Sequence, residues 1–157
     1  CLTKIKWGIW YILITDKSDK INKIIMKKIN NILTKGFHFT NLILIIFYLF
    51  PGSIFGYFLY DNSSIQPQIT KDFSFSDFLI SSNHLYVFIF LSTIGILAYH
   101  NTSKINFLIN YLFLLSIILE LFHNFIPNRG FEFSDLFGNI MGVVVVVILY
   151  KIKKKYE

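Results

Sequence analysis

Charged residues and cysteine are scarce in this chain, and each scarcity excludes a class of protein. Only 15% of the 157 residues are charged, whereas 54% are hydrophobic and 18% are aromatic. This balance excludes an ordinary soluble domain, and the apolar residues fall in blocks, which is typical of a membrane protein. The single cysteine, Cys1, excludes a disulfide framework and a cysteine metal cluster. No internal repeat or linker indicates a second domain.

The lysines gather at the two ends of the chain. Eight precede residue 36 and four close the chain, namely Lys4, Lys6, Lys17, Lys20, Lys23, Lys27, Lys28 and Lys35, then Lys151, Lys153, Lys154 and Lys155. A net charge of +6 suits nucleic acid in a soluble protein. Lysines just outside apolar spans instead set membrane topology and contact anionic headgroups. We therefore predict membrane lipids as partners and no nucleic-acid binding.

The N-terminal residues 1–39 are predicted to be a basic segment ahead of the membrane domain. Residues 5–14 are apolar and aromatic, but a span needs about 20 residues, so they suit an interfacial helix. Residues 15–36 repeat isoleucine and leucine at helical spacing, which predicts an amphipathic surface helix. A frayed basic tail is the alternative for that segment.

The beginning of the chain allows two interpretations. A mature lipoprotein carries its lipid on a residue such as Cys1, which would place the N-terminus outside, against the lysines that follow. We prefer a truncated or mis-started reading frame, because Met26 opens a basic segment ahead of a long apolar run. No small-residue cleavage site follows that run, so we expect it to remain as a span.

Four apolar segments predict an all-α integral membrane bundle at residues 40–150. They cover about residues 40–60, 85–99, 105–122 and 136–150, and we expect Pro51 to kink the first. The count of lysine and arginine places both termini in the cytoplasm, including a basic tail at residues 151–157. The link at residues 100–104 would also be cytoplasmic, and the other two links would face outward. The expected location is the bacterial inner membrane.

Polar residues concentrate between the last two predicted spans, where ionisable groups are costly and rarely lack a partner or a task. The group comprises Glu120, His123, Pro127, Arg129, Asp135 and Asn139. Glu120 and His123 are three apart, and Asp135 and Asn139 are four apart, so each pair shares a helix face. We predict that Arg129 lies between Glu120 and Asp135. The side chains of Asn139 and His123 would complete the hydrogen bonding.

The start of the fourth span carries capping and packing signals. Ser134 or Asp135 would be its N-cap. Gly138 and Gly142 have the small-xxx-small spacing that lets another helix approach closely. His84, at the outer mouth of the second span, either joins the polar cluster or only makes interfacial hydrogen bonds.

Metal and nucleophile chemistry are less well supported by the spacing. Glu120 and His123 form a Glu-x-x-His pair, as in di-metal helix sites, but those sites need a second copy, which this chain lacks. We therefore expect no metal and no cofactor. Ser134 as a nucleophile lacks an assignable base and orienting residue.

The cluster resembles the C-terminal signature of the VanZ-like membrane proteins, which runs Glu-x-x-Gln, Pro-x-Arg, Asp-x-x-x-Asn-x-x-Gly across the last two spans. The residues that carry the resemblance are Glu120, Pro127, Arg129, Asp135, Asn139 and Gly142. His84 resembles the histidine of the family's Asp-Lys-x-x-His element. The resemblance covers about residues 40–150.

Two departures from that signature concern the site. His123 replaces the usual Gln, and Ile80-Ser81 stand where Asp-Lys would be, although Asp77 can substitute one turn earlier. The resemblance implies a small multi-span protein of the cell envelope, in a family whose founding member is associated with resistance to the antibiotic teicoplanin. It supplies no settled biochemical activity.

Three functions remain open from the sequence. In the first, Arg129 grips an anionic group of a lipid or cell-wall precursor at the outer leaflet, oriented by Asp135, Asn139 and Glu120. In the second, the protein is an enzyme with Glu120 or His123 as general base on such a head group. In the third, the protein is a non-catalytic assembly subunit, and the polar residues only hold the helical hairpin of the last two spans together. A cavity that opens outward to the cluster favours the first two, and a sealed cluster favours the third.

Overall fold

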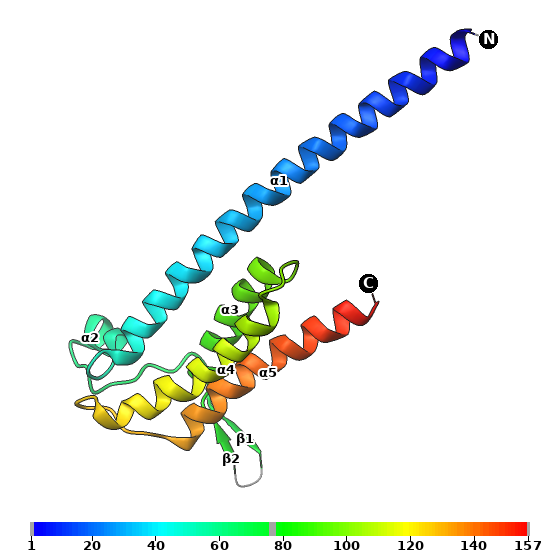
Figure 1. Cartoon of the computed structure of the whole chain (residues 1–157). Helices are drawn as coiled ribbons and strands as arrows, with labels where there is room; N and C mark the ends of the chain where they lie inside the picture. The colour runs from blue at the N-terminus through cyan, green and yellow to red at the C-terminus, as the bar shows by residue number, and fades with distance from the viewer. Residues whose placement is uncertain (1, 76–77, 157) are drawn as a thin grey trace.

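The computed structural model describes residues 2–75 and 78–156, with side chains from residue 20 onward except at the tip of one β-hairpin. Five α-helices, one 3-10 helix and two short strands occur in this part of the chain (Figure 1). In order they are α1 (Leu2–Leu49), α2 (Ile54–Tyr60), β1 (Phe73–Phe75), β2 (Phe78–Ile80), α3 (Ser82–Tyr99), α4 (Ile105–Phe122), η1 (His123–Phe125) and α5 (Phe133–Tyr156).

Four helices are long and apolar enough to cross a membrane, among the residues described. These segments are Lys20–Leu49, Ser82–Tyr99, Ile105–Phe125 and Phe133–Tyr156. Only a helix satisfies every backbone group within a single lipid-embedded segment, which explains why these apolar runs fold as helices. The predicted all-α bundle of four spans is therefore confirmed. The third predicted span coincides with α4.

The predicted position of the first span was wrong. Helix α1 ends at Leu49, so the span is Lys20–Leu49 and α2 is a separate short helix. Pro51 ends the helix instead of kinking it, because proline has no N–H and disfavours helical backbone in the residue before it. Gly52 then takes φ +79, a left-handed conformation suited to glycine, and reverses the chain.

The N-terminal segment is not a separate surface helix in this structure. Residues 15–36 belong to the same continuous helix as the first span, and their apolar side chains, such as Ile24 and Met26, are exposed. The side chains of residues 5–14 lie outside the described residues, so their interfacial placement stays a prediction. At the other end, α5 continues to Tyr156, so the closing lysines of the predicted basic tail lie on the last turns of a helix.

A small antiparallel hairpin in the first link was not predicted. β1 pairs with β2 in the register Phe73↔Ile80, and the chain enters α3 directly afterwards. The hairpin anchors the link above the start of α3, where Asp72 Oδ1 accepts a hydrogen bond of 2.8 Å from the Ser82 N–H. Asp77, the expected substitute acid, lies outside the described residues.

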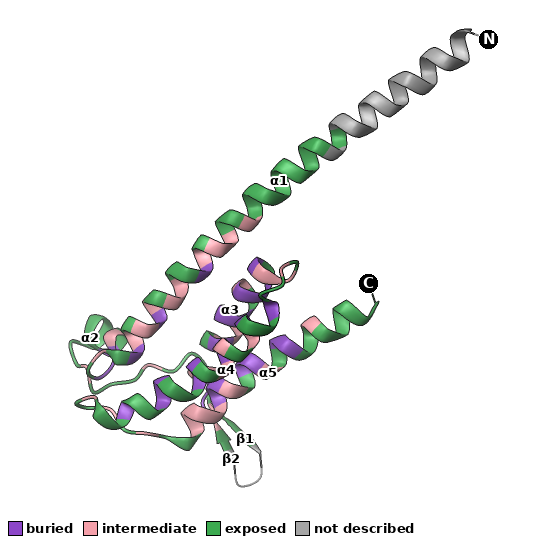
Figure 2. Ribbon diagram, in the orientation of Figure 1, coloured by how far each residue is buried: buried purple, intermediate pink, exposed green. Residues whose placement is uncertain are grey.

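Helices α3 and α5 form the closest packed pair, as the small-xxx-small spacing predicted. A Cβ on Gly138 would lie 2.6 Å from the Ser81 carbonyl oxygen, and one on Gly142 would lie 2.7 Å from that of Leu85. Only glycine permits so close a backbone approach. The buried residues line this seam and the facing sides of α1 and α4 (Figure 2). The packing brings the start of α3 against the start of α5.

The helix ends fall into two groups. In Figure 1, α2, the β-hairpin and the α4–α5 link lie together at one end of the bundle, whereas the α3–α4 link and the C-terminus lie toward the other. This is the arrangement that antiparallel spans with short connections require. The polar residues predicted as a site all belong to the first group.

Candidate functional site

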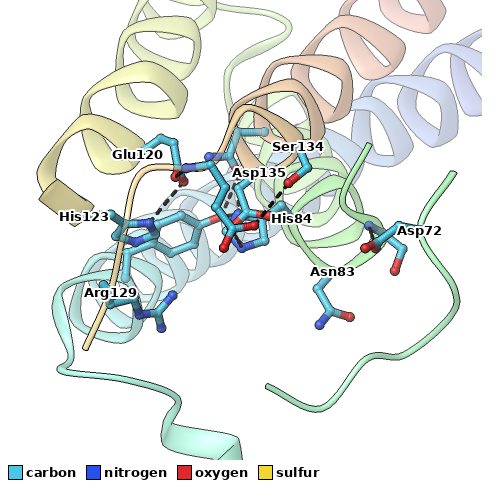
Figure 3. A network of polar contacts seen from close by, with 12 residues as sticks. Asp72, Asn83, His84, Glu120, His123, Arg129, Ser134 and Asp135 are labelled. Atoms are coloured by element: carbon cyan, nitrogen blue, oxygen red, sulfur yellow. Dashed lines mark hydrogen bonds and ion pairs between the residues drawn. The ribbon is translucent and has the colours of Figure 1, made fainter. Parts of the chain in front are cut away.

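The structure brings four helical elements together around the predicted polar residues. His84 lies in the first turn of α3, Glu120 near the end of α4 and His123 at the start of η1. Asp135 and Asn139 lie in the first two turns of α5. Figure 3 shows the side chains of His84, Glu120, His123 and Asp135 turned toward one another. All the predicted cluster residues therefore lie near one another, including His84.

Each acid of the cluster lies beside a histidine. His84 Nε2 is 3.2 Å from Asp135 Oδ2, and His123 Nδ1 is 3.2 Å from Glu120 Oε2. Glu120 and His123 are 0% and 1% exposed. Such burial requires partners, because an isolated charge in a low-dielectric interior costs several kcal/mol, as an order of magnitude. The predicted shared face of Glu120 and His123 is thus confirmed.

Glu120 also fixes the chain that connects α4 to α5. Its Oε1 accepts a hydrogen bond of 3.0 Å from the backbone N–H of Glu132. The N–H groups of Asp135 and Leu136 in turn donate to the Glu132 carbonyl, at 3.2 and 3.1 Å. Because α5 begins at Phe133, Ser134 and Asp135 lie inside its first turn, so the predicted N-cap role was wrong. The Asp135 side chain faces His84 instead.

Tyr48 is a member of the site that the sequence analysis missed. Its hydroxyl donates to Asn139 Oδ1 at 2.6 Å and lies 2.9 Å from His84 Nδ1. Its ring also stacks on His123, with centroids 5.5 Å apart. A tyrosine near the end of a span is the usual pattern of an interfacial aromatic belt, so its sequence position carried no distinguishing signal.

The predicted position of Arg129 between the two acids was wrong. Its Nε donates to the Gly52 carbonyl at 2.9 Å, and its Nη2 lies 3.5 Å from the Phe47 carbonyl. Among the described residues, no ion pair joins Arg129 to Glu120 or Asp135. The helix break after Leu49 leaves carbonyl groups without helical partners, and a cation is favourable at such a helix C-terminus. Arg129 stabilises that break.

Arg129 still interacts electrostatically with both acids, although it forms no ion pair with them. Partial burial lowers the pKa of the Arg129 guanidinium, and the negative charges of Asp135 and Glu120 oppose that effect. Arginine stays protonated in proteins, so the group remains a fixed cation. Its two observed hydrogen bonds use two of the five N–H donors that a guanidinium carries.

A cavity of about 140 Å³ opens beside this cation. Tyr48, His84 and Arg129 line it, together with apolar and polar side chains at the ends of α1 and α3. The complete lining is Leu44, Phe47, Tyr48, Ser53, Ile54, Phe55, Gln66, Pro67, Asn83, His84, Val87 and Arg129. One water needs about 10–15 Å³ by this kind of measure, so several waters or one small anionic group fit.

Asn83 holds residues 66–69 of the first link beside this cavity. Its Nδ2 donates to the Pro67 carbonyl at 2.8 Å, and its Oδ1 accepts from the Ile69 N–H at 2.9 Å. Figure 3 shows Asn83 and Asp72 on the side of the cluster that faces this link. This part of the link is thus fixed beside the cavity by two hydrogen bonds.

The structure gives Ser134 no activating base. Its Oγ donates to Glu132 Oε2 at 3.4 Å, and its carbonyl accepts from the Ser81 N–H at 3.0 Å. No histidine contacts this hydroxyl among the described residues. By contrast, potential metal-ligand atoms of His84, Glu120 and Asp135 all lie within 4.8 Å of one another. That set comes from three helices, so no local spacing in the sequence reveals it.

Comparison with models of known protein families, with curated proteins and with solved structures finds no match to this chain. The resemblance to VanZ-like proteins therefore stays a prediction. The structure shows an all-α bundle with four helices that are long and apolar enough to cross a membrane, and a buried polar cluster near one end of these helices.

Proposed function

We propose that this protein binds the phosphate of an anionic lipid, or of a lipid-linked cell-wall precursor, in the cavity beside Arg129. The observation that carries the proposal is that Arg129 lines an open cavity and forms no ion pair with Glu120 or Asp135. A guanidinium with free donors is well suited to phosphate, because its planar fork forms two parallel hydrogen bonds to two oxygens.

The remaining lining of the cavity suits a lipid. Leu44, Phe47, Ile54, Phe55 and Val87 contribute apolar surface, whereas His84, Asn83 and Gln66 contribute polar groups near Arg129. All these residues lie at the ends of spans or in the links beyond them, which is the depth of headgroups in a bilayer. An anionic headgroup on Arg129 would therefore leave its proximal chain against apolar side chains.

The positive-inside count favours an outward-facing cavity in the bacterial inner membrane, with both termini in the cytoplasm. The resemblance to VanZ-like proteins supports the same cell-envelope setting. Binding of an outer-leaflet lipid or a precursor headgroup fits both arguments.

The two other functions left open by the sequence receive less support. A locked hairpin is expected to be sealed, yet a cavity reaches Tyr48, His84 and Arg129. An enzyme with Glu120 or His123 as general base needs that base within reach of its substrate. Both side chains are buried, and neither lines the cavity. Binding is therefore the function that the site supports best.

Lipid binding in nanodiscs tests this proposal. The wild-type protein, Arg129→Gln and Arg129→Lys would be compared by native mass spectrometry in phosphatidylglycerol and in phosphatidylcholine bilayers. Lys71→Gln is the matched control, because it removes a cation from the same side of the bundle outside the cavity. Thermal unfolding of each variant would verify that it is folded.

We expect Arg129→Gln to weaken phosphatidylglycerol retention about 10–100-fold, the equivalent of 1.5–3 kcal/mol for charged hydrogen bonds. Arg129→Lys should lose part of it, because lysine keeps the charge but loses the fork. Folded Arg129→Gln with the affinity of Lys71→Gln would refute the proposal.

A further inference from the structure

The convergence of His84, Glu120 and Asp135 has properties that lipid binding by Arg129 does not explain. One ligand-type atom from each residue lies within 4.8 Å of the other two. Three different helices supply them, namely α3, α4 and α5, so the convergence is a product of the fold. Glu120 is fully buried, and the side chains of His84 and Asp135 are 12% and 13% exposed. Two carboxylates at this separation in a low-dielectric site repel each other unless a positive charge lies between them.

The hydrogen bonds around His84 determine which ring nitrogen carries a proton. Asn139 Nδ2 donates to the Ser116 carbonyl at 3.3 Å, which leaves Asn139 Oδ1 facing Tyr48 and His84. Tyr48 donates its hydroxyl proton to that oxygen, so His84 Nδ1 is the donor at 2.9 Å from the Tyr48 oxygen and 3.1 Å from Asn139 Oδ1.

In the neutral ring, the other nitrogen of His84 consequently carries a lone pair and no proton. That nitrogen, Nε2, points at Asp135 Oδ2 from 3.2 Å. Two lone pairs do not attract each other, so this contact is favourable only if a proton or a metal ion lies between the two atoms. An imidazole whose Nδ1–H is held by a neighbouring oxygen is the usual preparation of a histidine that binds metal through Nε2.

Glu120 gives an independent sign of the same kind. Its Oε2 is fully buried and has no hydrogen-bond partner among the described residues, and the group beside it is His123 Nδ1, 3.2 Å away. Its Oε1 is fixed by the Glu132 N–H, so the carboxylate is already oriented. Arg129, the nearest fixed cation, is turned to the carbonyls of Gly52 and Phe47. A buried, oriented carboxylate oxygen without a hydrogen-bond donor is available to coordinate a cation.

We propose that His84 Nε2, Glu120 and Asp135 bind a single divalent transition metal, with Zn²⁺ the best match. One imidazole and two carboxylates favour zinc over magnesium, which prefers oxygen ligands and several waters. Tetrahedral zinc–ligand distances of about 2.0–2.2 Å place the ligand atoms about 3.4 Å apart, so the widest pair, at no more than 4.8 Å, would have to close by up to about 1.4 Å on binding. The lone Glu-x-x-His pair, which gave no reason to expect a metal, is not the relevant pattern, because only its Glu120 is a ligand.

This site uses a different set of ligands from the phosphate-binding proposal, since Arg129 is not one of them. His84 belongs to both, because its side chain also lines the cavity. A metal there would lie beside the phosphate proposed for Arg129 and would add positive charge on its other side.

The test uses the full chain without a polyhistidine tag, purified in detergent and treated with a chelator. Zn²⁺ alone is titrated and followed by calorimetry, with bound metal counted by mass spectrometry and Co²⁺ absorption as a readout of coordination. Glu120→Gln and Asp135→Asn are the ligand variants. Glu132→Gln is the matched control, because its exposed side chain lies in the same link and its backbone N–H still reaches Glu120.

We expect one Zn²⁺ per chain in the wild-type protein and in Glu132→Gln, with affinity more than about 100-fold weaker in either ligand variant, since even outer partners of a metal change affinity by 10–100-fold. Arg129→Gln should keep its metal while losing phosphatidylglycerol, so the two proposals fail separately. A wild-type protein that binds no Zn²⁺, or a folded Asp135→Asn that binds as tightly as Glu132→Gln, would overturn the assignment.

Discussion

The seam between α3 and α5 positions His84 against Asp135, and Gly142→Ala tests its packing. The added Cβ would lie 2.7 Å from the Leu85 carbonyl oxygen, 2.7 Å from Phe88 Cβ and 3.0 Å from the Ile89 nitrogen. These atoms are backbone or attached to it, so no side-chain rotation relieves the contact and the helices must separate. Overpacking of this kind costs about 1–3 kcal/mol.

Two effects of that substitution oppose each other. Alanine improves helix propensity over glycine by about 1 kcal/mol, so the net loss in unfolding free energy should be about 0–2 kcal/mol. Gly36→Ala separates the two effects, because a Cβ on Gly36 of α1 meets nothing within 4 Å. Thermal unfolding in detergent should rank Gly36→Ala at or above wild type and Gly142→Ala below it. Equal stability of the two variants would refute the proposed close approach.

Two further predictions address the site and its orientation. Tyr48→Phe should lower the unfolding free energy by about 1–3 kcal/mol, since it removes a buried hydrogen-bond donor from Asn139. Thermal unfolding should show no such loss in Tyr86→Phe, because the Tyr86 hydroxyl is exposed. An equal loss in the two variants would contradict the role of Tyr48. After Cys1→Ser, single cysteines at Lys104 and Lys71 should react from inside and outside the cell, respectively; labelling of the Lys104 position from outside would reverse the proposed topology.

Hydropathy and spacing predicted the parts of this protein that depend on neighbouring residues. The apolar run of α4 has the same bounds as its predicted span, because length and composition decide whether a segment crosses. Glu120 and His123 lie together because i, i+3 residues share a helix face. Gly138 and Gly142 contact α3 because close helix approach needs small residues.

The errors concern partners that are distant in sequence. Arg129 was assigned to acids nine and six positions away, but its partners are the carbonyls of Gly52 and Phe47, 77 and 82 positions away. Those carbonyls are free only because α1 ends before Pro51, which hydropathy does not register. The convergence of His84 with Asp135 likewise depends on how α3 crosses α5.

The direct test of the central claim measures the distance from Arg129 to lipid phosphorus. Arg129 is the only arginine in the chain, so uniform [¹⁵N]arginine labelling reports on this guanidinium alone. Solid-state ³¹P–¹⁵N dipolar recoupling in phosphatidylglycerol bilayers should give a separation of about 4 Å, as when a phosphate oxygen accepts an arginine hydrogen bond of about 2.8 Å. A guanidinium signal without phosphorus dephasing in these bilayers would contradict phosphate binding at this cavity.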